Sequence, residues 1–113
     1  MAPAARERKE GRPAQAVAQV VYSRNALANL ERAFDFLAKN DPEAAVATAE
    51  AIQSAIEALA RHPLIGRPVG GQLHALVVSF GRTGYVALYR FVPARDEVRV
   101  LALRHQRELD YPV

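Results

Sequence analysis

The fold of this chain is decided by the stretch LHALVVSFGRTGYVALYRFVPARDEVRVLALRH, residues 73–105. It contains three apolar runs, at 73–80, 85–91 and 97–105, which are rich in the β-branched and aromatic residues that favour strands. The connections between them, 81–84 and 92–96, are too short to hold a crossover helix. The three runs therefore predict an antiparallel meander.

The residues before this meander predict one strand and a first helix. The run AQVVYS at 18–23 is short, β-branched and aromatic, which indicates a strand, and Ser23 suits a helix N-cap. An apolar stripe at helical spacing follows and should end near Lys39 and Asn40. The stripe consists of Leu27, Leu30, Phe34 and Leu37, widened by Ala26, Ala33 and Phe36.

A second helix is predicted to begin in NDPEAA, residues 40–45. Asp41 can cap it, Pro42 suits its first position, and Glu43 lies near the positive end of the helix dipole. The helix must end before Pro63, because the residue preceding a proline disfavours helical geometry. Its apolar stripe consists of Ala45, Ala49, Ile52, Ile56 and Leu59.

The segment at 62–71 contains two prolines and three glycines, and we expect a loop there. The predicted order is then β-α-α-β-β-β, an α+β fold with a helical hairpin packed on one face of a small, mainly antiparallel sheet. Residues 1–17 show no apolar periodicity and are expected to form a disordered leader. Residues 18–113 are expected to form the single folded domain.

Composition excludes several classes of protein. The chain has 113 residues, is 50% hydrophobic and 24% charged, and therefore suits one globular domain. It has no cysteine, which excludes disulfides and thiolate chemistry, and its three histidines show no metal-ligand spacing. We expect no metal and no cofactor. The N-terminus lacks an apolar signal segment and no run is long enough to span a membrane, so a cytoplasmic protein is expected.

The second half of the chain is basic. Residues 61–107 contain eight arginines but only two acidic residues, Asp96 and Glu97. The planar guanidinium group suits carboxylate and phosphate partners. This surface is either a solvated face or the binding surface for an acidic peptide or a nucleic acid.

The strands of the meander are apolar on both alternating sets of side chains. Strands of this kind normally have both faces covered, yet one helical hairpin covers only one face. We therefore expect the other face to meet another chain, or to line a half-exposed groove. The residues assigned to this partner surface are Leu76, Val78, Tyr85 and Tyr89, whereas Arg90 is expected near the rim of the helices.

The order of elements resembles the RelE/ParE family of type II toxin–antitoxin toxins, specifically the ParE-like or plasmid stabilization branch. The resemblance runs from about Val20 to Tyr111 and rests on NDPEAA, LARHPLIGRPV, FGRTGYVALYRF and VLALRHQRELDY. It implies a toxin that is neutralised by a cognate antitoxin with an acidic C-terminal segment, in a hetero-oligomer. ParE-like members act on DNA gyrase and trap cleaved DNA, whereas RelE-like members cleave messenger RNA in the ribosomal A site.

The same resemblance bears on the choice between these targets. RelE-like ribonucleases use lysines and arginines on the middle strands plus a C-terminal tyrosine. In this chain, Val86 follows Gly-Tyr at the position where the ribonucleases have an arginine. The run 73–80 also has no lysine. A non-enzymatic gyrase inhibitor is therefore the first hypothesis, a metal-free endoribonuclease the second, and an inactive antitoxin-binding remnant the third. Whether the protein is an enzyme stays open.

Two sets of candidate site residues follow from the resemblance. A target-binding surface would use Arg67, Arg82, Arg104, His105, Arg107, Glu108 and Tyr111. No catalytic residue is assigned to the gyrase inhibitor, but a ribonuclease would use Arg82, His105, Arg107 and Tyr111. His105 could equally be a structural histidine at the end of an apolar strand.

Overall fold

The computed structural model describes residues 17–80 and 83–106. The predicted leader at 1–17 lies outside this part of the chain except for Val17. The elements are β1 (Gln19–Tyr22), α2 (Arg24–Ala38), α3 (Pro42–Glu57) with a short 3₁₀ helix at Ala58–Ala60, β2 (Arg67–Gly70), β3 (Leu73–Phe80), β4 (Thr83–Val92), a second 3₁₀ helix at Pro93–Arg95, and β5 (Glu97–His105).

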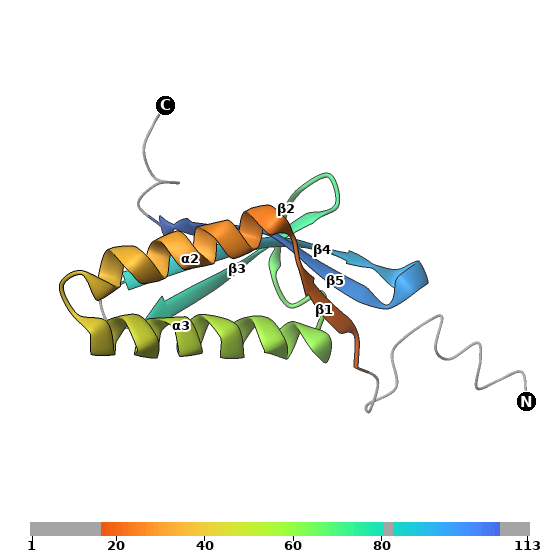
Figure 1. Cartoon of the computed structure of the whole chain (residues 1–113). Helices are drawn as coiled ribbons and strands as arrows, with labels where there is room; N and C mark the ends of the chain where they lie inside the picture. Colours follow the sequence, from red (N-terminus) through yellow and green to blue (C-terminus); the bar gives the residue numbers. More distant parts are fainter. Residues whose placement is uncertain (1–16, 81–82, 107–113) are drawn as a thin grey trace, which may run out of the picture.

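The strands form one five-stranded sheet in the order β1-β5-β4-β3-β2. Strands β3, β4 and β5 are antiparallel neighbours, as the short connections predict, and β1 is parallel to β5. Both helices lie on the same side of this sheet (Figure 1). The predicted α+β fold, with a helical hairpin on one face of a mainly antiparallel sheet, is confirmed.

The segment predicted as a loop at 62–71 contains one additional strand, β2. It pairs antiparallel with β3, its register shifts between Pro68 and Gly70, and all four of its residues are exposed. Gly70 and Gly71 follow with positive φ angles, which glycine adopts without steric cost. The strand was missed because the prolines and glycines of the segment 62–71 indicate a loop. Proline within a strand is confined to sheet edges, strand starts and bulges, and β2 is an edge strand.

The two helices begin where their caps were predicted. The Ser23 hydroxyl accepts a hydrogen bond from the Ala26 amide at 2.9 Å, and an Asp41 carboxylate oxygen accepts one from the Ala44 amide at 3.1 Å. Each cap satisfies an amide that has no partner within its helix. The hairpin is therefore specified locally at both helix starts.

The core lies between α3 and the middle of the sheet. The largest side chains that are fully buried are Ile52, Ile56 and Leu59 on the helical side, and Tyr89, Val98 and Val100 on the sheet. The apolar stripe predicted on the second helix is thus confirmed at Ile52, Ile56 and Leu59. The stripe on α2 is shifted: Ala26 is buried and Leu30 and Ala33 pack against the core, whereas Leu27, Phe34 and Phe36 are exposed.

Tyr89 attaches the segment before β2 to the core. Its ring is fully buried, and its hydroxyl oxygen accepts a hydrogen bond from the buried Gly66 amide at 2.8 Å. Burial raises the pKa of the Tyr89 phenol, and the hydrogen bond from Gly66 opposes that rise in part. A Cβ atom at Gly66 would lie 2.7 Å from the Tyr89 ring and 2.9 Å from the Ala75 carbonyl oxygen, so only glycine fits.

Truncating the buried helix stripe should destabilise the protein. Ile52→Ala leaves a cavity between α3 and the sheet, and we expect the free energy of unfolding to fall by about 2–5 kcal/mol. Val46→Ala is the matched control, because Val46 lies on the same helix but is 47% exposed; it should cost about 0.5 kcal/mol or less. Urea unfolding followed by circular dichroism measures both. Equal losses would show that α3 does not pack on the sheet as described.

Removing the Tyr89 hydroxyl should also destabilise the fold. Tyr89→Phe leaves the buried Gly66 amide without an acceptor, which should lower the free energy of unfolding by about 1–3 kcal/mol. Tyr22→Phe is the control, because the Tyr22 hydroxyl makes no hydrogen bond to any residue in 17–80 or 83–106; a similar loss in both variants would contradict the role of the Gly66 contact.

The pH dependence of stability measures the burial of the same hydroxyl, because burial is what raises its pKa. The pKa of Tyr89 is raised in the folded state, so the folded protein holds the phenol proton more tightly than the unfolded chain does. The stabilisation that results is fully present below the ordinary tyrosine pKa of about 10 and is lost as the pH rises through the raised pKa. Tyr89→Phe should therefore flatten the alkaline decline in thermal stability.

Candidate functional site

The C-terminal half of β5 is completed by side chains of α2. Strand β1 pairs only with Glu97–Val100, so no strand within residues 17–80 and 83–106 lies beside the backbone from Leu101 onward on that side. The Leu101 carbonyl accepts hydrogen bonds from the Ser23 hydroxyl at 3.1 Å and the Asn25 side-chain amide at 3.0 Å. The Leu103 amide donates to the Asn29 side-chain oxygen at 2.9 Å. These bonds hold the start of α2 along β5.

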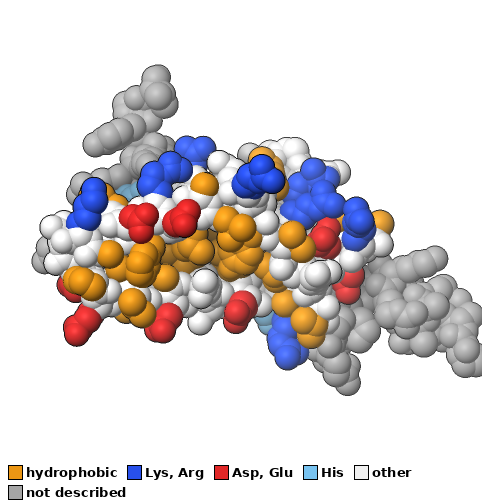
Figure 2. Space-filling view, viewed as in Figure 1, with side chains coloured by type: hydrophobic (Ala, Val, Ile, Leu, Met, Phe, Trp, Pro, Cys, Tyr) orange, Lys and Arg blue, Asp and Glu red, His pale blue; other side chains and the backbone are white. Residues whose placement is uncertain are grey.

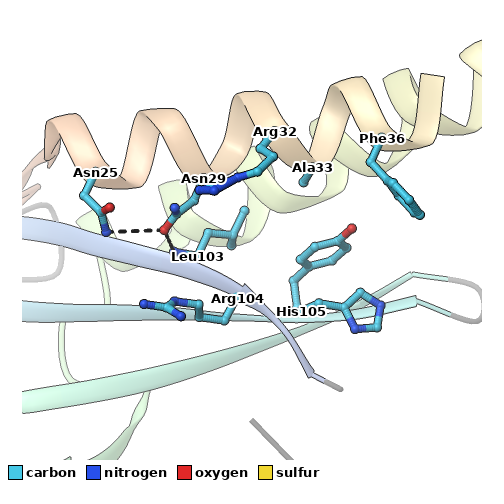
Figure 3. Close-up of a pocket in the computed structure, with 9 residues that line it drawn as sticks. Asn25, Asn29, Arg32, Ala33, Phe36, Leu103, Arg104 and His105 are labelled. Carbon is cyan, nitrogen blue, oxygen red and sulfur yellow. Dashed lines mark hydrogen bonds between the residues drawn. The ribbon is translucent and has the colours of Figure 1, made fainter. Parts of the chain in front are cut away.

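A groove with a volume of about 620 Å³ lies between α2 and the ends of β4 and β5. Figure 3 shows Asn25 at one end of it and Phe36 and His105 toward the other. The lining residues come from three elements, α2, β4 and β5. They are Asn25, Asn29, Arg32, Ala33 and Phe36 of α2, and Tyr85, Leu103, Arg104 and His105 of the sheet.

The groove combines positive charge with apolar surface. Arg32 is exposed and His105 is half-buried, and none of the lining residues is acidic. Arg104 lines the edge of the groove, but the strand register directs its side chain to the other face of the sheet. Phe36, which also lines the groove, is 65% exposed. A ligand that fits this surface carries an anionic group next to an apolar one.

His105 is the lining residue whose side chain is best suited to acid–base chemistry. Its ring meets the buried Tyr85 ring edge-on, with centroids 5.1 Å apart, which fixes its orientation. Histidine can exchange a proton near neutral pH, but metal-free RNA cleavage also needs a second proton-transfer group. Asparagine, alanine, phenylalanine, leucine and arginine supply none, which leaves Tyr85 as the second candidate on the groove.

Neither helix of the described residues lies on the opposite face of the sheet (Figure 1). Cross-strand neighbours in an antiparallel pair lie on the same face. The register therefore places one row of Ala75, Leu88 and Ala102 there, and a second row of Val77, Val86 and Arg104. Arg67 lies opposite Ala75, and Arg90 opposite Arg99. We call this surface the open face, and its charged residues are four arginines and Glu97.

The predicted target-binding residues are divided between these surfaces. Arg67 is exposed on β2, Arg104 is exposed on the open face, and His105 points to the helix side. A register shift next to Tyr89 places Leu101 as an extra residue in β5, and this reverses the sides on which the residues after it lie. Arg82, Arg107, Glu108 and Tyr111 lie outside the described residues.

The predicted partner surface needs a correction. Val78, Tyr85 and Tyr89 are buried in the core under the helices, and Leu76 packs against them. Both sets of side chains on β3 and β4 are apolar, so the sequence did not indicate which set the helices cover. Arg90 is accordingly on the open face and not near the helix rim.

Several groove residues were missed by sequence reasoning. Asn25, Asn29, Arg32 and Phe36 recur at spacings of four, three and four residues, which places them on one side of α2. This spacing is a signal that the sequence contains. It was hidden because the apolar stripe of the same helix dominates the pattern.

The helix side of the molecule carries charges of both signs. Figure 2 shows hydrophobic side chains gathered between α2 and α3, with acidic side chains along both helices and basic side chains along α2. The exposed hydrophobic residues on these helices are Leu27, Phe34, Phe36 and Val46. The two sides of the molecule would therefore suit partner segments of different charge.

Within 17–80 and 83–106, no group of three or more histidine or acidic side chains could hold a metal ion. None of the helices in this part of the chain has the length and hydrophobicity required to cross a membrane.

Comparisons with known proteins identify the family. The family model for the ParE toxin of the type II toxin–antitoxin system parDE matches residues 20–110. Toxin RelE3 of Caulobacter vibrioides is 37% identical over 86 residues, covering 76% of this chain and 88% of the relative. Toxin RelE1 of the same bacterium is 30% identical over 73 residues, covering 65% of this chain and 78% of the relative.

Solved structures show the same fold. The chromosomal ParDE toxin–antitoxin system from P. aeruginosa matches with a TM-score of 0.69 at 20% identity, covering 80% of this chain and 98% of the other. The RelBE2 toxin–antitoxin complex from Mycobacterium tuberculosis matches with a TM-score of 0.54 at 21% identity, covering 81% and 94%. Because the family model spans most of the domain, and two curated toxins match most of their own length, this chain belongs to the RelE/ParE family of type II toxin–antitoxin toxins.

Proposed function

We propose that this toxin inhibits DNA gyrase in the cytoplasm, as a ParE-like member of its family. The observation that carries the proposal is the arrangement around His105. Arg104 and His105 project to opposite sides of the sheet, and Val86, beside Arg104 on the open face, is apolar and buried. This arrangement favours a recognition surface over a catalytic centre, because general acid–base chemistry needs its groups around one reacting phosphate.

Ribosome-dependent cleavage of messenger RNA is the second candidate. Its support is that the curated relatives that match are named RelE toxins. In this case the basic groove would hold the RNA backbone, and His105 would serve as one of the proton-transfer groups. Arg82, Arg107 and Tyr111 would complete the set.

We also propose that a cognate antitoxin neutralises the toxin. The matched solved structures are toxin–antitoxin systems, and the open face offers arginines around an apolar centre. An antitoxin segment with acidic and apolar residues, unfolded until it binds, fits that surface. The toxin would then occur as a hetero-oligomer with its antitoxin. The further possibility, an inactive remnant that only binds antitoxin, predicts no growth inhibition.

Induced expression without antitoxin distinguishes the candidates. For gyrase inhibition we expect filamentous cells, an induced DNA-damage response and cleaved DNA, while messenger RNA remains intact. Mapping of transcript ends and of DNA breaks after induction measures both. Transcript ends aligned with codons would support ribonuclease activity and contradict the proposal of gyrase inhibition. Normal growth would favour the inactive remnant.

Substitutions in the groove should distinguish recognition from catalysis. If the groove recognises a target, Arg32→Ala and His105→Ala should each weaken growth inhibition in a graded way, because binding energy is shared among several contacts. If His105 transfers a proton, His105→Ala alone should reduce the rate of RNA cleavage by about 10²–10⁴-fold.

Arg24→Ala is the control for these substitutions, because Arg24 is an exposed arginine of the same helix that does not line the groove. It should leave growth inhibition unchanged. Thermal melting of each variant checks that the fold is intact, and an effect of Arg24→Ala equal to that of Arg32→Ala would contradict a role for the groove.

A further inference from the structure

Two arginines face each other directly across neighbouring strands of the open face. Arg90 on β4 and Arg99 on β5 are register partners. Side chains in such positions lie within about 5.5 Å at their Cβ atoms, and like charges there destabilise the pair. The register therefore places two arginine side chains next to each other on one face of the sheet, with one acidic residue, Glu97, near them.

The hydrogen bonds of these two groups are incomplete. The Arg99 Nε donates to a Glu97 carboxylate oxygen at 2.9 Å. The Arg90 Nε is buried and has no hydrogen-bond partner among the described residues. A buried donor without an acceptor is costly, and this cost adds to the repulsion. The paired like charges and the buried donor without an acceptor both destabilise the isolated fold at the same place. Unfavourable features of this kind are typical of a functional site.

We propose that Arg90 and Arg99 together form a binding site for a carboxylate of an acidic, amphipathic partner segment. A carboxylate placed between the two guanidinium groups accepts hydrogen bonds from both and removes their repulsion. The inference rests on the proposed neutralisation by an acidic antitoxin segment and names the position and chemistry of one of its contacts.

The surroundings favour a peptide over a nucleic acid. Next to the arginine pair lies the apolar row of Ala75, Leu88 and Ala102, which has Arg67 at its β2 end. An apolar centre with a charged rim is the usual plan of a protein interface. Single-stranded nucleic acid instead needs aromatic platforms, and Tyr22, Tyr85, Tyr89 and Phe91 all pack on the helix side.

The purified chain provides a direct test. The probe is a synthetic peptide in which leucine and glutamate alternate, with a leucine–glutamine peptide of equal length as the uncharged control. The signal of the Arg90 Nε–H group in nitrogen-15 NMR spectra reports on the donor that has no partner. We expect the glutamate peptide to shift this signal and the glutamine peptide to leave it unchanged.

Charge-matched variants make the test specific. Arg90→Gln and Arg99→Gln should each weaken peptide binding by about 10- to 100-fold, the range for hydrogen bonds to charged groups. Arg95→Gln makes the same change in net charge at an exposed arginine in the turn between β4 and β5; it should weaken binding by at most about fivefold. Arg90→Gln should leave the melting temperature of the free chain unchanged or raise it.

Three results would overturn the proposal. Equal weakening by Arg90→Gln and Arg95→Gln would show that only net charge matters. A lower melting temperature of Arg90→Gln with normal peptide binding would show a purely structural arginine. If a single-stranded oligouridylate binds more tightly than the leucine–glutamate peptide and also shifts the Arg90 signal, the site belongs to a nucleic acid. None of these measurements involves gyrase, ribosomes or growth, so a failure of the proposed function in cells is distinguishable from a failure here.

Discussion

The structure depends on hydrogen-bond partners for the backbone groups along both edges of β5. This strand lies between β4 and β1, but β1 reaches only its first four residues. Ser23, Asn25 and Asn29 supply the missing hydrogen bonds further along. Because Ser23 also caps α2, one short polar segment fixes the start of the helix, its alignment with β5 and the groove between them.

Much of the fold is predictable because its signals are local. Helix caps at Ser23 and Asp41, the helical spacing of Ile52 and Ile56, and the short turns between apolar runs each depend on neighbouring residues. The edge strand β2 was not predictable from the same signals. Its pairing with β3 is a tertiary effect, and the prolines and glycines of the segment 62–71 indicate a loop when β3 is not considered.

The site was harder to predict than the fold because it depends on which side of the sheet each residue faces. Strands β3 and β4 are apolar on both sets of side chains, so Tyr89 and Val86 were equally plausible as core residues. The extra residue at Leu101 then exchanges the faces of Arg104 and His105 relative to a regular strand. Neither fact is visible in hydrophobic patterning. The pairing of Arg90 with Arg99 likewise needs the register of two strands.

The two edges of the sheet affect how this protein can associate with itself. Strand β2 is short and fully exposed, its register shifts after Pro68, and it ends at Gly70, which together with Gly71 has a positive φ. Strand β1 at the other edge has only four residues. Edges of this kind resist edge-to-edge pairing, which is a common start of aggregation. Both edges of this apolar sheet therefore disfavour pairing with the edge of a second copy. The short and irregular edges, rather than the faces of the sheet, therefore oppose the growth of the sheet by addition of further copies.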